Sequence, residues 1–327
     1  MTTHRPASGS TIRRPLATSL RAVGLGVAVL FVLGVTGCGP RFTPGAGSTG
    51  AAGGASGPIL VVAAEGFWGD IAAHLGGDRV EVASIITSPD TDPHDYEPTA
   101  ADARTVAQAR VAVVNGVGYD PWATKLLEAD PAPGRAVIDV GGLVGATGGD
   151  NPHRWYYPGD VEQVIDRITG TYQSIDPAHA AYFDQQRQAY EDTDLARYHR
   201  LLDEVHRRFA GTPVGASESI FVGLAEATGL DLATPPAFLT AVSEGSDPTA
   251  GDKAIVDRQI AGRQIAVFVY NRQNATPDIQ ALVDAATAQG IPVTTITETP
   301  PSGTSFADWQ SDQLQALVDA LARATGR

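Results

Sequence analysis

The sequence predicts an α/β protein with two parallel-sheet lobes that are joined by one long linker helix. Strand-length apolar runs alternate with helical segments between residues 58 and 175, which is typical of a parallel sheet. The same alternation resumes between residues 211 and 327. Between them, residues 176–210 repeat apolar side chains at helical spacing and contain no glycine and one proline, near their start. The 327 residues, 43% of them hydrophobic, suffice for two cores.

The first 38 residues predict an export signal that is not part of the fold. Residues 1–21 are basic, and the apolar residues 22–35 are too short to span a membrane comfortably. Small residues then precede Cys38, the chain's only cysteine. This pattern resembles a bacterial lipoprotein signal, so we expect a lipid anchor on Cys38 and an extracytoplasmic protein held at the cell membrane. An ordinary secretory signal is the alternative, and the Arg13-Arg14 pair leaves twin-arginine export open.

The part of the chain that follows is acidic. Residues 39–57, rich in small residues, predict a flexible tether. The whole chain has a formal net charge of -14, and residues 1–37 hold 4 of its 23 basic residues and none of its 37 acidic ones. Such a charge disfavours nucleic acid and anionic lipid heads as partners, and it suits a cationic ligand or simple solubility.

The first lobe is predicted to alternate strands and helices in a regular order. Its strands are expected at residues 59–64, 80–86, 111–114 and 136–140, and its helices at residues 67–75, from residue 99, at residues 121–129 and at residues 160–174. Thr99 and Asp102 are spaced as a capping box for the second helix. Residues 141–158 predict a long, glycine-rich loop, and loops of that length are usually functional.

The linker and the second lobe complete the predicted architecture. Residues 176–210 are expected to form a single helix, with two helices broken near residues 192–194 as the alternative. In the second lobe, strands are expected at residues 212–216, 237–242, 265–270 and 293–296, and helices at residues 219–227, 277–289 and 306–324.

Two of the seven histidines lie in loops that are stiffened by proline and that follow predicted strands. His94 is flanked by Pro93 and Pro98, and His153 follows Pro152. Because ligands of open α/β sheets bind beyond the carboxyl ends of the strands, both are candidate ligands, with two unrelated loop histidines as the alternative. The other histidines of the predicted folded part are expected on helix surfaces: His74, His179, His199 and His206.

The second lobe offers two carboxylates in corresponding places. Glu218 lies at a strand-to-helix junction, where the helix dipole alone would favour a carboxylate. Glu298 follows the last predicted strand, beside Pro300 and Pro301, and a solvated loop carboxylate is the alternative there. In contrast, residues 271–274 offer only neutral or cationic groups.

Five motifs in order resemble those of the zinc/manganese branch of substrate-binding proteins of bacterial ABC importers. They are DPHDYEPT at residues 92–99, NGVGYDPW at 115–122, NPHRW at 151–155, SESIF at 217–221 and TE at 297–298. The resemblance implies a metal held between the lobes by His94, His153 and Glu218. It also implies delivery of the ion to a membrane permease powered by a separate ATPase.

Two departures from the family pattern affect the expected site. The family usually has an aspartate as its fourth ligand, and here the matching acid is Glu298, which either ligates directly or leaves the position to water. After its second histidine the family often has Trp-Leu-Asp-Pro, whereas this chain has Trp-Tyr-Tyr-Pro at residues 155–158; Asp160 is expected to cap the next helix instead. One of Asp92, Asp95 and Glu97 is expected to orient His94.

The expected cargo is Zn²⁺ or Mn²⁺. Two imidazoles with one or two carboxylates suit Zn²⁺, while Mn²⁺ prefers more oxygen ligands. A glutamate in third place resembles the manganese version, but affinity favours zinc, which we prefer slightly. We therefore expect a monomeric binding protein and no enzyme. A zinc-dependent hydrolase with Glu298 as general base is one alternative, although the chain has no His-Glu-x-x-His motif. An adhesin-like surface lipoprotein with a degraded metal site is another.

Overall fold

A computed structural model describes residues 57–91, 93–94 and 96–327 of the chain. The predicted signal, the lipidation site Cys38 and nearly all of the tether therefore lie outside the described residues, as do Asp92 and Asp95. Within these ranges, no helix is both long enough and apolar enough to cross a membrane.

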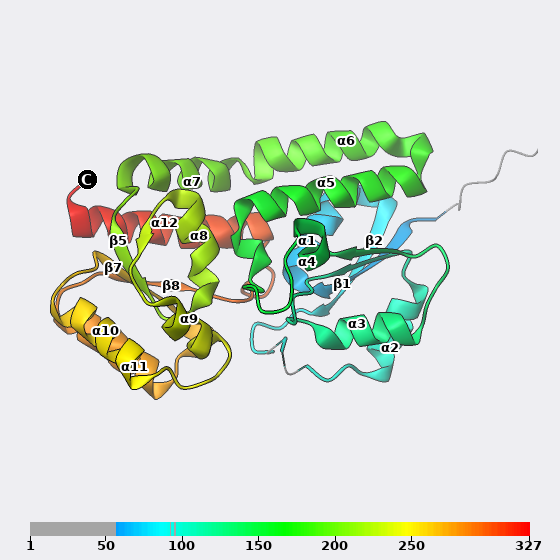
Figure 1. The fold of residues 1–327 in the computed structure, drawn as a ribbon. Coiled ribbons are helices and arrows are strands. Elements are labelled where there is room, and N and C mark those ends of the chain that lie inside the picture. Colours follow the sequence, from blue (N-terminus) through cyan, green and yellow to red (C-terminus); the bar gives the residue numbers. More distant parts are fainter. Residues whose placement is uncertain (1–56, 92, 95) are drawn as a thin grey trace, which may run out of the picture. The chain divides into compact units, whose positions relative to one another are not determined.

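The N-terminal half of the described chain is built on a four-stranded parallel sheet (Figure 1). In spatial order its strands are β2 (Val80–Ile86), β1 (Ile59–Glu65), β3 (Val111–Val114) and β4 (Ala136–Asp139). Its helices are α1 (Gly66–Gly76), α2 (Ala100–Gln108), α3 (Pro121–Ala129), α4 (Val140–Val144) and α5 (Pro158–Ile175). The predicted capping box of α2 is present, since Thr99 and Asp102 each accept a hydrogen bond from the other's backbone N–H.

The C-terminal half repeats this plan, again counting only the residues that the structure describes. Its parallel strands are β6 (Asp231–Leu232), β5 (Pro213–Ala216), β7 (Val267–Asn271) and β8 (Val293–Ile296), in that spatial order. Its helices are α8 (Val222–Thr228), α9 (Pro236–Ser243), α10 (Ala250–Ala261), α11 (Pro277–Ala288) and α12 (Phe306–Thr325). The predicted fold class, two parallel-sheet α/β lobes, is confirmed.

Several local features differ from the sequence predictions, among them helix α10, for which no element was expected. Residues 237–242 were expected to form a strand but belong to helix α9, because a short apolar run fits a buried helix as well as a strand. The second strand of this sheet is instead the two-residue β6, which the sequence pattern does not signal. The expected loop at residues 141–158 contains helix α4 and a 3₁₀ turn at Arg154–Tyr156.

The linker is helical, with one irregular turn. Helix α6 (Ala180–Ala189) is continued by a π-helical turn at Tyr190–Asp194 and then by α7 (Ala196–Phe209). In Figure 1, α6 lies beside the N-terminal half and α7 continues beside the C-terminal half, next to α12. The π turn coincides with the break at residues 192–194 that was the alternative to a single helix, but the backbone stays helical through it.

The hydrophobic core is shared by both halves. In the part of the chain that is described, one cluster of contacting buried side chains runs from β1 through α5 and α7 to β5 and α12. It includes the fully buried Trp68, Trp155 and Phe209. Because a large separation of the halves would expose this shared apolar surface to water, the core restricts movement between them.

Candidate metal site

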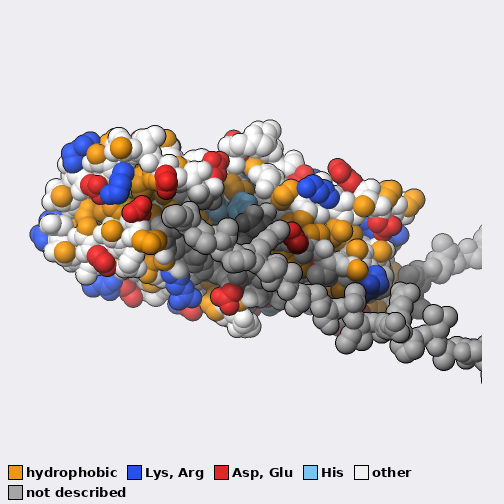
Figure 2. Space-filling model, turned by 90° about the horizontal axis from the view of Figure 1, so that it is seen from below, with side chains coloured by type: hydrophobic (Ala, Val, Ile, Leu, Met, Phe, Trp, Pro, Cys, Tyr) orange, Lys and Arg blue, Asp and Glu red, His pale blue; other side chains and the backbone are white. Residues whose placement is uncertain are grey.

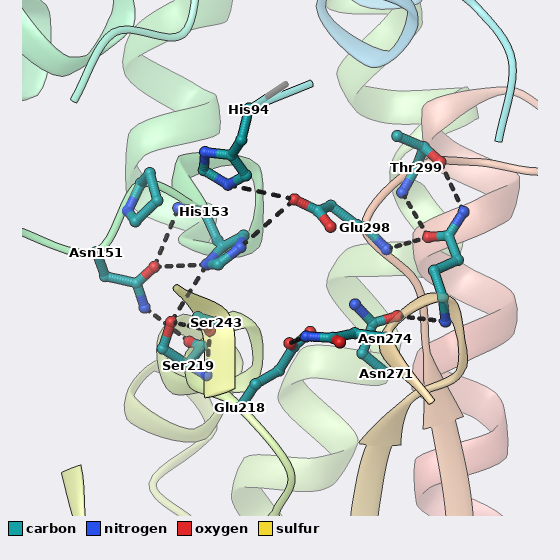
Figure 3. A network of polar contacts seen from close by, with 12 residues as sticks. His94, Asn151, His153, Glu218, Ser219, Ser243, Asn271, Asn274, Glu298 and Thr299 are labelled. Atoms are coloured by element: carbon teal, nitrogen blue, oxygen red, sulfur yellow. Dashed lines mark hydrogen bonds and ion pairs between the residues drawn. The ribbon is translucent and has the colours of Figure 1, made fainter. Parts of the chain in front are cut away.

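The four side chains that the sequence singled out line one cavity of about 1130 Å³. His94 follows β2, His153 follows β4 and α4, Glu218 follows β5, and Glu298 follows β8. All four therefore lie beyond the carboxyl ends of strands, where open α/β sheets bind ligands. Figure 2 shows histidine side chains in a hollow between two parts of the surface. Figure 3 shows both imidazoles pointing toward the Glu298 carboxylate.

Glu298 is the residue on which the two imidazoles converge. Its Oε1 lies 3.9 Å from His94 Nε2 and 3.8 Å from His153 Nε2. The same oxygen is buried and has no hydrogen-bond partner. Ligand atoms around a tetrahedral zinc lie about 3.3 Å apart, so these groups are slightly too far apart for a bound ion. Accordingly, no set of three or more His, Cys, Asp or Glu side chains among the described residues has the spacing of a finished metal site.

His153 is held in one tautomer by Asn151. The Asn151 Oδ1 accepts hydrogen bonds from the His153 backbone N–H at 3.0 Å and from Nδ1 at 2.7 Å. The amide orientation is set on its other side, where Nδ2 donates to the Ser219 carbonyl at 2.7 Å. An amide oxygen only accepts, so His153 Nδ1 carries a proton, and in the neutral ring that binds a metal the Nε2 lone pair faces the cavity. His153 is 3% exposed.

His94 is more exposed than His153, and its loop is held by contacts with two aromatic residues that lie later in the chain. The Trp122 indole N–H donates to the Pro93 carbonyl at 3.2 Å. The Tyr119 ring packs edge-on against the His94 imidazole, with ring centroids 4.7 Å apart. The His94 side chain is nevertheless 36% exposed. Of the acids expected to orient it, Asp92 and Asp95 lie outside the described residues, and Glu97 is exposed.

Glu218 is a buried carboxylate, 3% exposed, on the opposite side of the cavity from His94. Its Oε2 accepts a hydrogen bond from Asn274 Nδ2 at 2.8 Å. Burial raises the pKa of Glu218; the charge of His153 offsets part of the rise, and that of Glu298 adds to it. Two neighbouring carboxylates in a buried place favour a cation between them.

The backbone before Glu298 is fixed by three side chains from two other elements. The Thr297 carbonyl accepts from the Tyr156 hydroxyl at 2.6 Å. The Thr297 hydroxyl accepts from the Trp309 indole at 2.8 Å, and Gln313 Oε1 accepts from the Thr297 N–H at 2.7 Å. Burial alone would raise the pKa of Glu298, but its electrostatic interactions with His153 and His94 outweigh burial, so its pKa lies below the usual range.

Sequence reasoning missed part of this site. Residues 271–274 were set aside because they offer neutral or cationic groups, yet Asn274 orients Glu218. Their position directly after β7 was the signal that could have identified them. The expectation for Asp160 was wrong: helix α5 has no side-chain cap, and Asp160 instead forms an ion pair with Arg154.

Comparison with known proteins assigns the family. Residues 61–320 match the model of the family described as "Zinc-uptake complex component A periplasmic". Over 129 residues the chain is 32% identical to the iron-binding protein YfeA of Yersinia pestis. This match covers 38% of this chain and 41% of YfeA. The chain is 26% identical to the metal ABC transporter substrate-binding lipoprotein FimA of Streptococcus parasanguinis, over 70% of this chain and 78% of the relative. It is 23% identical to the manganese ABC transporter substrate-binding lipoprotein PsaA of Streptococcus pneumoniae, over 81% of this chain and 90% of the relative.

Solved structures share the fold at lower sequence identity. A Mn-bound periplasmic metal binding protein from Candidatus Liberibacter asiaticus superimposes with a TM-score of 0.67 at 18% identity, covering 80% of this chain and 99% of that one. The protein FpvC from Pseudomonas aeruginosa, in complex with Mn²⁺, superimposes with a TM-score of 0.65 at 20% identity. The match covers 81% of this chain and 99% of FpvC. Since the family model spans most of the chain, the resemblance seen in the sequence is confirmed: the protein belongs to the family of the periplasmic component A of zinc-uptake complexes.

Proposed function

We propose that this protein is an extracytoplasmic receptor that binds a divalent transition metal and delivers it to an ABC importer. One observation carries the proposal. A buried Glu298 oxygen without a hydrogen-bond partner lies 3.8 Å and 3.9 Å from the Nε2 atoms of two histidines that come from the other half of the molecule. A cation placed among these atoms would be coordinated by the carboxylate oxygen and by both imidazole nitrogens.

The proposed ligands are His94, His153, Glu218 and Glu298. The names of the relatives include iron and manganese, and that of the family includes zinc. Any site of two imidazoles and two carboxylates binds Zn²⁺ more tightly than Mn²⁺. Mn²⁺ would require both carboxylates to bind through two oxygens, or water to fill the coordination shell. We therefore propose zinc as the tighter ligand and manganese as the second.

The partners and the location follow from the same proposal. The relatives named as ABC transporter lipoproteins support a permease and its ATPase as partners, and an extracytoplasmic place of action. Lipidation of Cys38 would hold the protein at the cell membrane, and we propose that it works there as a monomer. The division into a lobe at residues 58–175, a linker at 176–210 and a lobe at 211–327 stays a prediction.

We propose binding and not catalysis as the activity of the site. In a hydrolase, Glu298 would have to stand apart from the metal as general base. Support for a ligand role comes from its Oε1, which lies close to both imidazole nitrogens. The degraded-site alternative finds no support either, since all four side chains line the same cavity.

The test is titration of the chelator-treated, full-length protein with Zn²⁺ and Mn²⁺ by calorimetry. One Zn²⁺ per chain is expected, and His153→Ala should weaken binding at least about 100-fold because it removes a ligand. His179→Ala is the matched control, since that histidine lies at the surface beside Asp176. Equal binding by His153→Ala and the parent would refute the site.

A further inference from the structure

The loop after β7 holds both proposed carboxylate ligands without supplying a ligand itself. Asn274 Nδ2 donates to Glu218 Oε2 at 2.8 Å. Gln273 Oε1 accepts from the backbone N–H groups of Glu298 at 2.6 Å and Thr299 at 3.1 Å. The loop is itself braced by Asn271, whose side chain accepts from the Gln273 N–H at 2.9 Å. One short segment thus sets the position of the two acids.

The other end of the Gln273 side chain reaches the opposite half of the molecule. Its Nε2 donates to the Pro89 carbonyl at 2.6 Å and to the Thr299 hydroxyl at 2.8 Å. Pro89 lies in the loop that follows β2 and leads to His94. The side-chain amide has two N–H groups and one oxygen with two lone pairs, and all four positions are used. Gln273 therefore connects the loop of His94 to the backbone of Glu298.

Release of a bound ion needs a part of the site that moves. The shared core restricts separation of the two halves, so small loop movements are the available route. His94 is the most exposed of the proposed ligands, at 36% of its side chain, whereas His153 and Glu218 are each 3% exposed. The loop that carries His94 is thus the side from which an ion leaves with the least rearrangement.

We infer that Gln273 is a positioning residue that fastens the His94 loop to Glu298 and thereby sets the rate at which the metal leaves. The inference rests on the proposed function. Gln273 is solvent-exposed, and hydrogen bonds at an exposed position add little net stability because water can replace them, so the fastening can open without unfolding. Its hydrogen bonds run to the Pro89 carbonyl on one side of the cavity and to the Glu298 backbone N–H on the other, so it acts through the backbone.

The test compares zinc release from the full-length parent, Gln273→Ala and Gln273→Met, by stopped-flow transfer to a chelator. Both variants should release zinc about tenfold faster, while association stays within about twofold of the parent. Methionine keeps the length of the side chain and removes its hydrogen bonds, so it separates their loss from a loss of packing. Gln280→Ala is the control, since that side-chain amide lies on the exposed face of α11 and donates to Asp284 at 2.9 Å.

Unchanged release in both variants would overturn the inference, as would release that changes in Gln273→Ala but not in Gln273→Met. Hydrogen exchange of the Glu298 and Thr299 amides in zinc-free protein provides a second measurement that does not depend on metal. Faster exchange in both variants than in the parent is expected, and equal exchange would contradict the fastening. If the parent itself binds no zinc, the proposed function fails, and this exchange measurement alone decides whether Gln273 positions Glu298.

Discussion

At the scale of single residues, the site depends on side chains that orient the proposed ligands. Asn151 fixes the tautomer of His153 with one amide oxygen and contacts the Ser219 carbonyl, next to Glu218, with its nitrogen. The same amide thus orients a proposed ligand from one half of the molecule and touches the backbone beside a proposed ligand from the other. This arrangement links the geometry of His153 to that of Glu218.

Replacing Asn151 should therefore weaken zinc binding without removing a ligand. Asn151→Ala frees the His153 ring to rotate and change tautomer, and an affinity loss of about 10–100-fold is expected. Asn151→Asp keeps the acceptor for Nδ1 but loses the N–H that donates to the Ser219 carbonyl, so its affinity loss should be smaller than that of Asn151→Ala. Competition with a coloured chelator measures both; equal affinity of Asn151→Ala and the parent would contradict the role assigned to Asn151.

Glu65 is a second residue whose chemistry is set by burial. It ends β1, is fully buried, and neither carboxylate oxygen has a hydrogen-bond partner. Burial raises the pKa of Glu65 well above 4.5, and the charge of Asp120 raises it further. Protonation of Glu65 removes the repulsion between its charge and that of Asp120. We expect Glu65 to be neutral in the folded protein over a wide range of pH.

This gives a stability prediction with a definite sign. In the unfolded chain Glu65 loses its proton near pH 4.5, while the folded protein keeps it to higher pH. The stabilisation from the bound proton is therefore complete below that value and is lost as pH rises toward the raised pKa. Glu65→Gln should remove this slope, so urea unfolding should show it more stable relative to the parent at pH about 8 than at pH about 4. The same pH dependence in variant and parent would be the contrary result; Glu97→Gln, at an exposed position, is the control.

The sequence singled out the four proposed ligands, which line one cavity, but not the residues that orient them. His94 and His153 stand out because prolines stiffen the loops around them after strands, which is a local pattern. Gln273 and Asn274 have no such pattern, since their roles depend on which carbonyl or carboxylate the fold brings within 3 Å. For Asp160 the sequence predicted a role that the structure does not show. Its carboxylate forms an ion pair with Arg154, whereas its local position had suggested a helix cap.

At the scale of elements, the π turn in the linker has a cause in the spacing of buried residues. Tyr190 and Leu195, both 1% exposed, are five residues apart, one more than the spacing that keeps two side chains on one face of an α-helix. The hydrogen bond from the Leu195 N–H to the Tyr190 carbonyl, at 2.9 Å, closes the wider turn. The turn thus keeps the buried stripes of α6 and α7 aligned.

Deleting one exposed residue from that turn should be tolerated. Removal of Thr193 reduces the spacing to four, which a regular α-helix accommodates, so the melting temperature should not fall. Removal of Arg200 from α7 instead rotates all later positions by about 100° and takes Leu201 and Val205 off the buried face, so this variant should be strongly destabilised. Circular dichroism melts compare the two; equal losses in both deletions would show that the π turn does not compensate for an extra residue.

Individual strands and helices also show where the secondary-structure prediction succeeded and where it failed. Strands such as β3 and β8 were predicted with their observed bounds because short runs of apolar or β-branched residues there are bounded by turn residues. Helix α9 also has a short apolar run, but it begins at Pro236 in the first helical position, and its Phe238 and Val242 lie in one buried cluster with Phe268 of β7. Strand β6 has only two residues, which carry no periodicity at all.

At the scale of the whole molecule, the two halves have the same strand order and share one core. Each described sheet places its first strand next to its third, so the carboxyl ends of both sheets provide loops at the cavity. The alternation of strands and helices along the sequence predicted these two parallel sheets, because a parallel sheet follows from that order and not from individual side-chain contacts. The shared core could not be predicted, since it depends on how the faces of α5, α7 and α12 meet.

The central claim is that one metal ion binds between the two halves through His94, His153, Glu218 and Glu298. Crystals of the zinc-loaded protein, measured on both sides of the zinc absorption edge, test it most directly. We predict one anomalous peak in the cavity, within about 2.0–2.2 Å of both Nε2 atoms and of an oxygen of each carboxylate. A zinc-loaded crystal with no peak there, or with its peak bound by other residues, would contradict the account.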